Sequence, residues 1–253
     1  MPPAYKSVPA IEKCFATLGL FSATENPLGI TDISRQLSLN KSTVFNMVYT
    51  LIDQKILDDL GNGKFGFGPR FYMMMGHTLS KRSRLVHIVH PYLQRINRET
   101  KLSAFLGIRS DLKAVLIDKA DSAFGIKLSS EIGMQMPVLG GVGIKAMLSL
   151  LSRKQVDELI GNAVLKRYTP YTIVEKEAYL DEIDKIRREG IALDREEYIE
   201  GISAVGVPIK MKNRQIQAAI WIVGLNWQLA VESLQNVKNL LEGIAEEVNT
   251  QLG

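Results

Sequence analysis

Residues 29–70 read GITDISRQLSLNKSTVFNMVYTLIDQKILDDLGNGKFGFGPR, and this stretch decides the fold of the first third of the chain. Ile33 and Leu37, spaced i, i+4, predict a short helix with Thr31 as its candidate cap. After a turn at 38–40, Asn40 is a good N-cap for a second helix. The apolar stripe of that helix repeats at i, i+3, i+4, i+7 and i+8. It consists of Val44, Met47, Val48, Leu51 and Ile52.

The opposite face of the second helix has no acidic side chain before Asp53. Short hydroxyl and amide groups with a lysine suit DNA, because they bind phosphates and the edges of bases in the major groove. An ordinary solvated helix face is the alternative. The residues of this face are Lys41, Ser42, Thr43, Asn46, Tyr49 and Thr50.

Next, residues 56–60 and 64–67 flank the glycine-rich turn Gly61–Asn62–Gly63, which predicts a β-hairpin. An amphipathic helix is predicted upstream at about 8–22, beside which Cys14 is expected to be a small core residue. Together these elements form a winged helix-turn-helix, in which the second helix of the pair enters the major groove. Arg35, Asn62 and Lys64 are expected to touch the DNA backbone.

Charge and composition agree with a DNA-binding first part. Residues 1–84 hold 10 Lys/Arg and 6 Asp/Glu, whereas the rest of the 253 residues hold 21 of each, so the whole net charge of +4 lies in the first third. The 46% hydrophobic and 23% charged residues are globular proportions. No apolar run is long enough for a membrane span, and the start has no secretory signal. We therefore expect a soluble, cytoplasmic protein.

The pattern changes after the hairpin. Pro69 is expected to open a methionine-rich helix over 71–80, either core filling or a face that pairs with another copy. A domain boundary is expected near the basic polar break at 81–84, followed by a further helix from 85 to about 100 that is interrupted or bent at Pro91. Strands mixed with helices then predict an α+β fold with a mainly antiparallel sheet. The expected strands are 103–110, 113–120, 124–131, 203–210 and 215–224, and the expected helices are 143–152, 153–160, 175–189 and one that closes the chain.

The residues quoted at the outset resemble the DNA-binding domain of IclR-type bacterial transcriptional regulators. The most specific pieces are Lys41–Val44, which opens the second helix, and Phe67–Arg70, which ends the hairpin. The resemblance continues through residues 133–146, 194–208 and 218–224. It implies a winged helix-turn-helix domain at 1–68, a linker helix at 69–83 and a GAF-like effector-binding and oligomerisation domain at 84–253. It also implies a homodimer or a dimer of dimers on a double-stranded DNA operator.

The same resemblance places a small-molecule site in the second domain. It implies that Gly140, Gly141 and Asp194 border the effector, although the glycines also suit close helix packing alone. Where many relatives have polar groups, this chain has Leu139, Gly141, Ala204, Trp221 and Val223. With Met136 nearby, these changes favour a flatter, more apolar effector, for which we hypothesise an aromatic acid. Alternatively, Trp221 fills the pocket itself.

Signals for catalysis or metal binding are weak. His77, His87 and His90 are all the histidines, and no carboxylate follows at metal-ligand spacing. The acidic stretch 194–197 has no accompanying nucleophile or phosphate loop. The sequence therefore predicts a ligand-responsive transcription factor without catalytic residues, metal or cofactor. The rival is an enzyme or metabolite-binding protein whose winged helix contacts other proteins.

Overall fold

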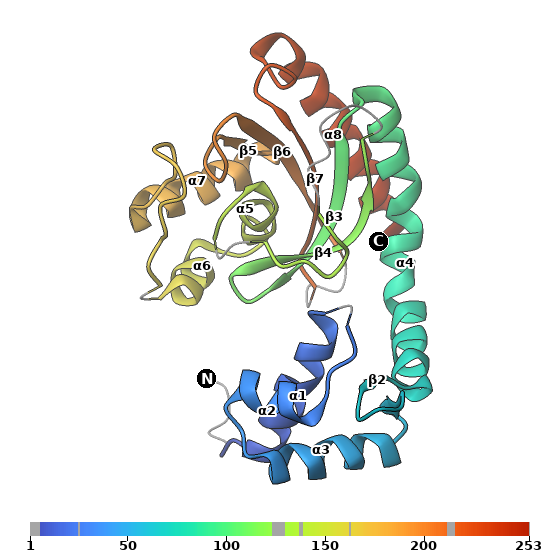
Figure 1. The fold of residues 1–253 in the computed structure, drawn as a ribbon. Coiled ribbons are helices and arrows are strands. Elements are labelled where there is room, and N and C mark those ends of the chain that lie inside the picture. The colour runs from blue at the N-terminus through green and yellow to red at the C-terminus, as the bar shows by residue number, and fades with distance from the viewer. Residues whose placement is uncertain are drawn as a thin grey trace. The chain divides into compact units, whose positions relative to one another are not determined.

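The computed structural model describes residues 6–24, 26–122, 130–136, 139–161, 163–211 and 216–252, with side chains left out at 75–83 and 231–232. The chain divides into two compact units, and the boundary lies between residues 83 and 84. Each unit is described by itself below (Figure 1).

The first unit is a winged helix-turn-helix. Its helices are α1 (Pro9–Ser22), α2 (Ile30–Leu37) and α3 (Lys41–Asp53), and its antiparallel wing consists of β1 (Leu57–Asp59) and β2 (Phe65–Phe67). The apolar stripe of α3 packs inward as the spacing predicts, with Val44 and Val48 fully buried. They join Ile33, Leu57 and Phe65 in one core cluster. The wing turn has positive φ at Gly61, Asn62 and Gly63.

Local details of this unit differ from the predictions. The N-cap of α2 is Gly29 and not Thr31, and the Asp32 carboxylate accepts a hydrogen bond from the Gly29 amide at 3.0 Å. Asp32 takes the reciprocal role of a capping box and leaves no capping role for the threonine. Asn40 occupies the N-cap position of α3 without a side-chain capping bond. The predicted stripe of α1 is only partly buried, because Phe15 is 70% exposed whereas Phe21 is buried.

The two helices expected on either side of residues 81–84 form a single helix. Helix α4 runs without interruption from Pro69 to Thr100. Lysine, arginine and serine are compatible with helical backbone, so a polar run ends a helix only when Gly, Pro or a cap accompanies it. Pro91 lies inside the helix, and the helix continues through it.

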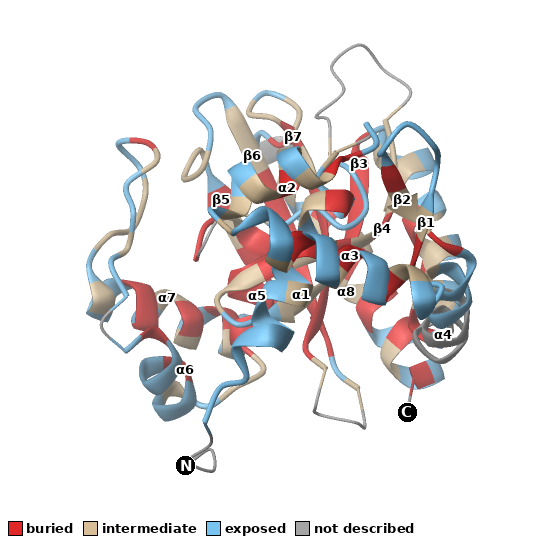
Figure 2. Ribbon diagram, turned by 60° about the horizontal axis from the view of Figure 1, so that its bottom comes forward, coloured by how far each residue is buried: buried red, intermediate tan, exposed pale blue. Residues whose placement is uncertain are grey.

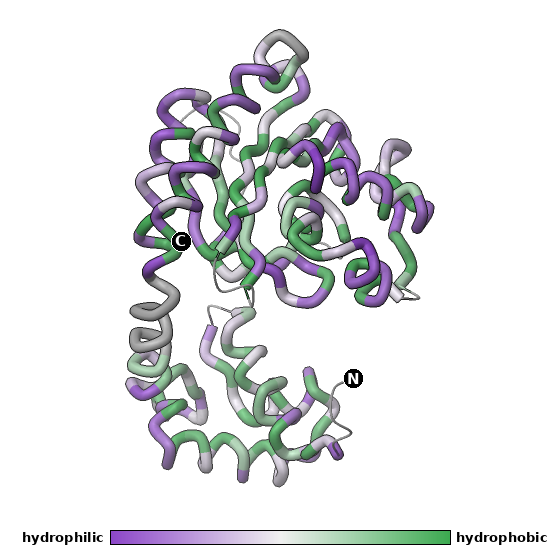
Figure 3. The backbone as a smooth tube through the Cα atoms, turned by 180° about the vertical axis from the view of Figure 1, so that it is seen from behind, coloured by the Kyte–Doolittle hydropathy of each residue, from purple (hydrophilic) through white to green (hydrophobic). Residues whose placement is uncertain are grey.

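The second unit is a five-stranded antiparallel sheet between two layers of helices (Figure 1). Its strand order is β4-β3-β7-β6-β5. One face packs on α8 (Val231–Leu252) and the second part of α4, through residues such as Val89, Leu93 and Leu241. These helices carry alternating hydrophilic and hydrophobic stretches in Figure 3. The other strands are β3 (Ser103–Ser110), β4 (Lys113–Ala120), β5 (Ala192–Arg195), β6 (Ile202–Ile209) and β7 (Ala218–Leu225).

The opposite face of the sheet packs on α5 (Val142–Leu148). Helix α7 (Lys176–Glu189) packs on α5, and α6 (Arg153–Ile160) packs on α7, within the same apolar cluster. Ser152 and Gln155 form a capping box at the start of α6, and Gly190 ends α7 in the left-handed region. The α+β class with an antiparallel sheet is therefore confirmed. Strand β5 was not predicted, and the strand expected at 124–131 lies outside the described residues apart from Ser130 and Glu131.

Candidate functional sites

The polar face of α3 points away from the core of the first unit (Figure 2). Thr43 is half-buried, and the side chains of Lys41 and Asn46 have no partner among the residues that the structure describes. The Thr50 hydroxyl donates to the Asn46 carbonyl at 2.7 Å, so its proton is used within the helix. The exposed members of the face are Lys41, Ser42, Asn46, Tyr49 and Thr50.

An aromatic pair shares this face and was missed by the sequence reasoning. Phe45 is 47% exposed, and its ring centroid lies 4.3 Å from that of Tyr49. The Tyr49 ring in turn meets Phe65 of the wing edge-on, at 6.1 Å. Phe45 is a large apolar residue that lies outside the apolar stripe of α3. That position in the sequence could have identified it as an exposed apolar side chain on the polar face. The stack holds an apolar surface beside Asn46.

The predicted backbone-contacting cations gather around one acid. The Lys64 ammonium lies 2.7 Å from Asp32 Oδ2, and the Arg35 guanidinium lies 3.7 Å from Asp32 Oδ1. The hydrogen bond from Lys64 lowers the pKa of Asp32 below its usual value, helped by the Gly29 amide. This contact ties the wing to α2. Asn62 is exposed at the tip of the wing turn.

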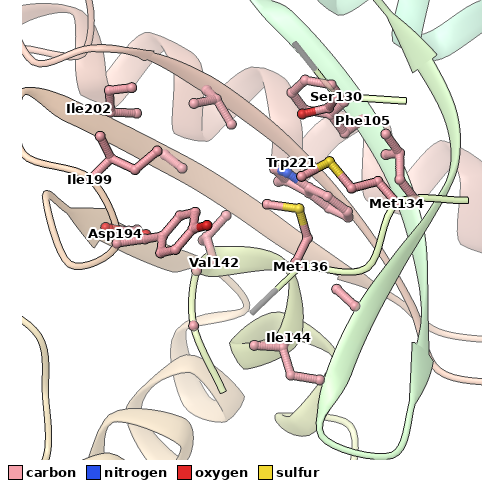
Figure 4. Close-up of a pocket in the computed structure, with 18 residues that line it drawn as sticks. Phe105, Ser130, Met134, Met136, Val142, Ile144, Asp194, Ile199, Ile202 and Trp221 are labelled. Atoms are coloured by element: carbon pink, nitrogen blue, oxygen red, sulfur yellow. The ribbon is translucent and has the colours of Figure 1, made fainter. Parts of the chain in front are cut away.

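In the second unit, a cavity of about 160 Å³ lies between the sheet and α5 (Figure 4). Seven of the eight residues expected at the effector site line it: Met136, Gly140, Gly141, Asp194, Ala204, Trp221 and Val223. Leu139 does not line it. Its side chain is buried in the core, and its carbonyl accepts a hydrogen bond from the Tyr179 hydroxyl at 3.1 Å. The lining residues not foreseen are Phe105, Ala114, Leu116, Ser130, Met134, Val142, Gly143, Ile144, Tyr198, Ile199 and Ile202.

Trp221 forms a wall of the cavity and leaves space beside it. The indole is 2% exposed and lies against two glycines. A Cβ at Gly107 would lie 2.6 Å from its Cη2 atom, and one at Gly143 would lie 3.0 Å from its Cε3 atom. Real Cβ atoms rarely approach that closely. Both glycines are therefore needed to accommodate the ring.

Asp194 is the charged side chain among the described lining residues of this cavity. It is 6% exposed, and its Oδ1 atom accepts a hydrogen bond from the Glu197 amide at 2.7 Å. Burial raises the pKa of Asp194 to about 6; the Glu197 amide opposes the rise, as does the Lys145 charge, while the Glu197 charge adds to it. Lys145 is itself buried and forms an ion pair with Glu197.

This raised pKa predicts a pH-dependent stability. Between pH 4 and 6 the folded chain keeps a proton on Asp194 that the unfolded chain releases, so the free energy of unfolding falls as the pH rises, by about 3 kcal/mol in total. Asp194→Asn should remove this part of the pH dependence. Urea unfolding at pH 4.5 and 7 measures it, with the exposed Glu246→Gln as a control that keeps the wild-type dependence. An Asp194→Asn chain with the full wild-type slope would contradict the assignment.

Among the side chains that the structure describes, the remaining sequence candidates show no catalytic arrangement, and the side chain of His77 lies outside that part. His90 does have a carboxylate neighbour, Asp118, with Nδ1 and Oδ2 2.9 Å apart, a contact between α4 and β4 that the spacing did not reveal. Within the described residues, no group of three or more His, Cys, Asp or Glu could hold a metal ion. No described helix is both long and apolar enough to cross a membrane.

Comparison with protein families matches both units. The family described as "Bacterial transcriptional regulator IclR C-terminal" matches residues 77–250, and the "IclR helix-turn-helix domain" matches residues 10–59. The HTH-type transcriptional regulator XynR of Escherichia coli (strain K12) is 26% identical over 247 residues, which are 97% of this chain and 98% of that protein.

Solved structures share the fold over nearly the whole chain. An IclR transcriptional regulator from Alicyclobacillus acidocaldarius superposes with a TM-score of 0.81 at 22% identity, covering 98% of this chain and 100% of that one. An IclR homolog from Microbacterium hydrocarbonoxydans, solved in complex with 4-hydroxybenzoate, has a TM-score of 0.82 at 19% identity, covering 96% of this chain and 98% of that one.

Proposed function

The chain belongs to the IclR family of bacterial DNA-binding transcriptional regulators, and from this premise we propose that α3 reads a DNA operator while the cavity beside Trp221 binds a metabolite that controls DNA binding. The protein would act in the cytoplasm as a homodimer or a dimer of dimers, because a palindromic operator needs two copies of the reading helix. The relatives named above are regulators, and no described cluster of residues favours an enzyme.

The exposed, acid-free face of α3 is the observation that carries the DNA-binding part of the proposal. Its lysine suits a phosphate, and its asparagine suits a base edge. Lys64 and Arg35 are proposed to meet the backbone from beside α3. Their ion pairs with Asp32 reduce the charge that they offer to phosphates.

Phe45 adds an apolar contact with a base to the polar contacts proposed for α3. An exposed phenylalanine on a reading helix offers an apolar contact to the C5 methyl group of thymine. Its stack with Tyr49 limits the movement of the ring. We therefore propose that Phe45 distinguishes thymine from bases that lack a methyl group.

Replacing thymine by uracil removes only this methyl group. DNA that binds the full chain would first be selected from a random library, and each thymine then exchanged for uracil. We expect one such exchange, in a single half-site, to weaken wild-type binding about fourfold, which corresponds to the free energy of one buried methyl group. In Phe45→Ala the two DNAs should bind equally, as measured by fluorescence anisotropy. Phe15 is another exposed phenylalanine, and Phe15→Ala should keep the preference for thymine over uracil. If Phe45→Ala also kept this preference, the proposal would be contradicted.

The effector is proposed to be a flat, largely apolar molecule with about the volume of one aromatic ring. A dry apolar cavity of about 150 Å³ in another protein accommodates benzene, and this one has about 160 Å³. Its lining is mostly aliphatic, aromatic and methionine side chains. The structural neighbour that holds 4-hydroxybenzoate supports a ligand of this size.

The effect of ligand binding on the affinity for DNA tests the proposal that the cavity binds an effector. We expect at least one of toluene, phenol and 4-hydroxybenzoate to change the affinity of the full chain for its selected DNA by about fivefold or more, a usual lower size for allosteric coupling. Anisotropy titrations with and without each compound measure it. If none changes either the DNA affinity or the melting temperature, the cavity is not an effector site of this kind.

A further inference from the structure

We infer that the effector presents a hydrogen-bond donor, a hydroxyl or a protonated amine, to the Asp194 carboxylate, and that its polar end is not a carboxylate. This inference rests on the proposed effector function and narrows its chemical class. It departs from the aromatic acid that the sequence alone suggests.

The charge of the cavity lining is the first argument. Among the lining residues that the structure describes there is no Lys, Arg or His, and Asp194 is the one carboxylate. The other polar side chains of this lining are Ser130 and Tyr198. Lys145, whose charge acts to lower the pKa of Asp194, is 1% exposed and forms an ion pair with Glu197. An acidic effector would thus meet a negative charge without a described cation to offset it.

The second argument is the hydrogen bonding of Asp194. Its Oδ1 atom accepts from the Glu197 amide, whereas Oδ2 has no hydrogen-bond partner among the described residues. In Figure 4, Asp194 lies on the opposite side of the cavity from Phe105 and Met134. A ring placed between the sulfur and aromatic side chains can therefore direct one substituent toward Asp194.

The energetics favour a donor at this position. A hydrogen bond from the ligand to an ionised carboxylate is stronger than one to a neutral acceptor. Two carboxylates that share a buried site repel each other, so that one of them must take up a proton. At pH 7.5 most of Asp194 is ionised despite its raised pKa of about 6, and an ionised carboxylate accepts hydrogen bonds but donates none.

Four ring compounds that differ in one substituent test the inference on the full chain at pH 7.5. They are benzylamine, benzyl alcohol, benzoate and toluene, and calorimetric titration measures each dissociation constant. We expect benzylamine and benzyl alcohol to bind more tightly than toluene, and benzylamine to bind at least about tenfold more tightly than benzoate, because a hydrogen bond to a charged group is worth that factor.

Asp194→Asn provides the decisive comparison, because it keeps the size of the side chain and the acceptor for the Glu197 amide. We expect it to lose about tenfold or more in affinity for benzylamine and to gain affinity for benzoate, to which an amide can donate. Asp111→Asn, the same exchange at an exposed residue outside the lining, should keep the wild-type order of the four compounds.

The contrary outcomes are distinct. Benzoate as the tightest ligand of the wild type, or an unchanged order in Asp194→Asn, would overturn the inference while the ring-sized pocket stands. Toluene binding as tightly as benzylamine and benzyl alcohol would do the same. Failure of all four compounds to bind, toluene included, would overturn the proposed pocket and the inference with it.

Discussion

Lys41→Ala combined with Asn46→Ala is expected to lower the affinity for selected operator DNA about 100-fold while the fold stays intact. The asparagine is proposed to contact a base edge, and the lysine is proposed to contact a phosphate. Both side chains are exposed on α3 and have no described partner, so their removal leaves the core of the first unit unchanged. Gel-shift titration measures the affinity, and far-ultraviolet circular dichroism measures the fold.

A matched double variant controls for the loss of charge and amide groups elsewhere. Lys154 and Asn239 are exposed on α6 and α8 of the second unit. Lys154→Ala with Asn239→Ala should bind the operator like the wild type. Sequence-specific binding that survives in the Lys41 and Asn46 variant would show that another surface reads the DNA.

Trp221→Ala is expected to cost about 3–5 kcal/mol of unfolding free energy, the usual cost of truncating a large buried aromatic side chain. The indole is 2% exposed and packs on Phe105 at 5.9 Å between ring centroids. Added indole should restore part of the lost stability, because the deletion leaves a space of its shape against Gly107 and Gly143. Urea unfolding with and without indole measures both effects.

The second tryptophan of the chain is the natural control. Trp227 is 73% exposed, and Trp227→Ala should change the stability by no more than about 0.5 kcal/mol. A loss of less than 1 kcal/mol in Trp221→Ala would mean that the ring is not a packed wall of the cavity.

Periodicity made most of the fold predictable. The stripe of α3 and the alternation in β4 identify both the element and its buried side, and the continuous apolar run in β3 identifies a strand that is buried along most of its length. Strand β5 has only four residues, and Asp194 occupies one of its buried positions, where the alternating pattern of a strand would have an apolar residue. Strand β5 forms through its pairing with β6, so its own four residues show little of the pattern from which a strand is predicted.

The details of the DNA-binding face depend on contacts between distant residues. Lys64 and Asp32 are 32 positions apart, so no local pattern reveals that the wing cation is paired. Phe45 is next to the apolar stripe in sequence, yet the geometry of the helix turns it outward, where Tyr49 stacks on it. Sequence reasoning that sorted residues by polarity left this phenylalanine out.

The cavity could be located from the sequence through family resemblance, whereas its chemistry required coordinates. The resemblance pointed to Ala204 and Trp221, which line the cavity, but also to Leu139, which belongs to the core. The burial of Asp194 and the pairing of Lys145 with Glu197 both arise from tertiary packing. Because of these two features, we propose an effector that carries a hydrogen-bond donor where the sequence alone suggested an aromatic acid.

The central claim, that α3 lies against the operator, is tested most directly by photo-crosslinking. Tyr49 on α3 or the exposed Tyr171 of the second unit would be replaced by benzoylphenylalanine in the full chain and irradiated with selected DNA. We expect a covalent DNA adduct from position 49 and none from position 171. An adduct from position 171, with none from a position-49 chain that still binds the DNA, would contradict it.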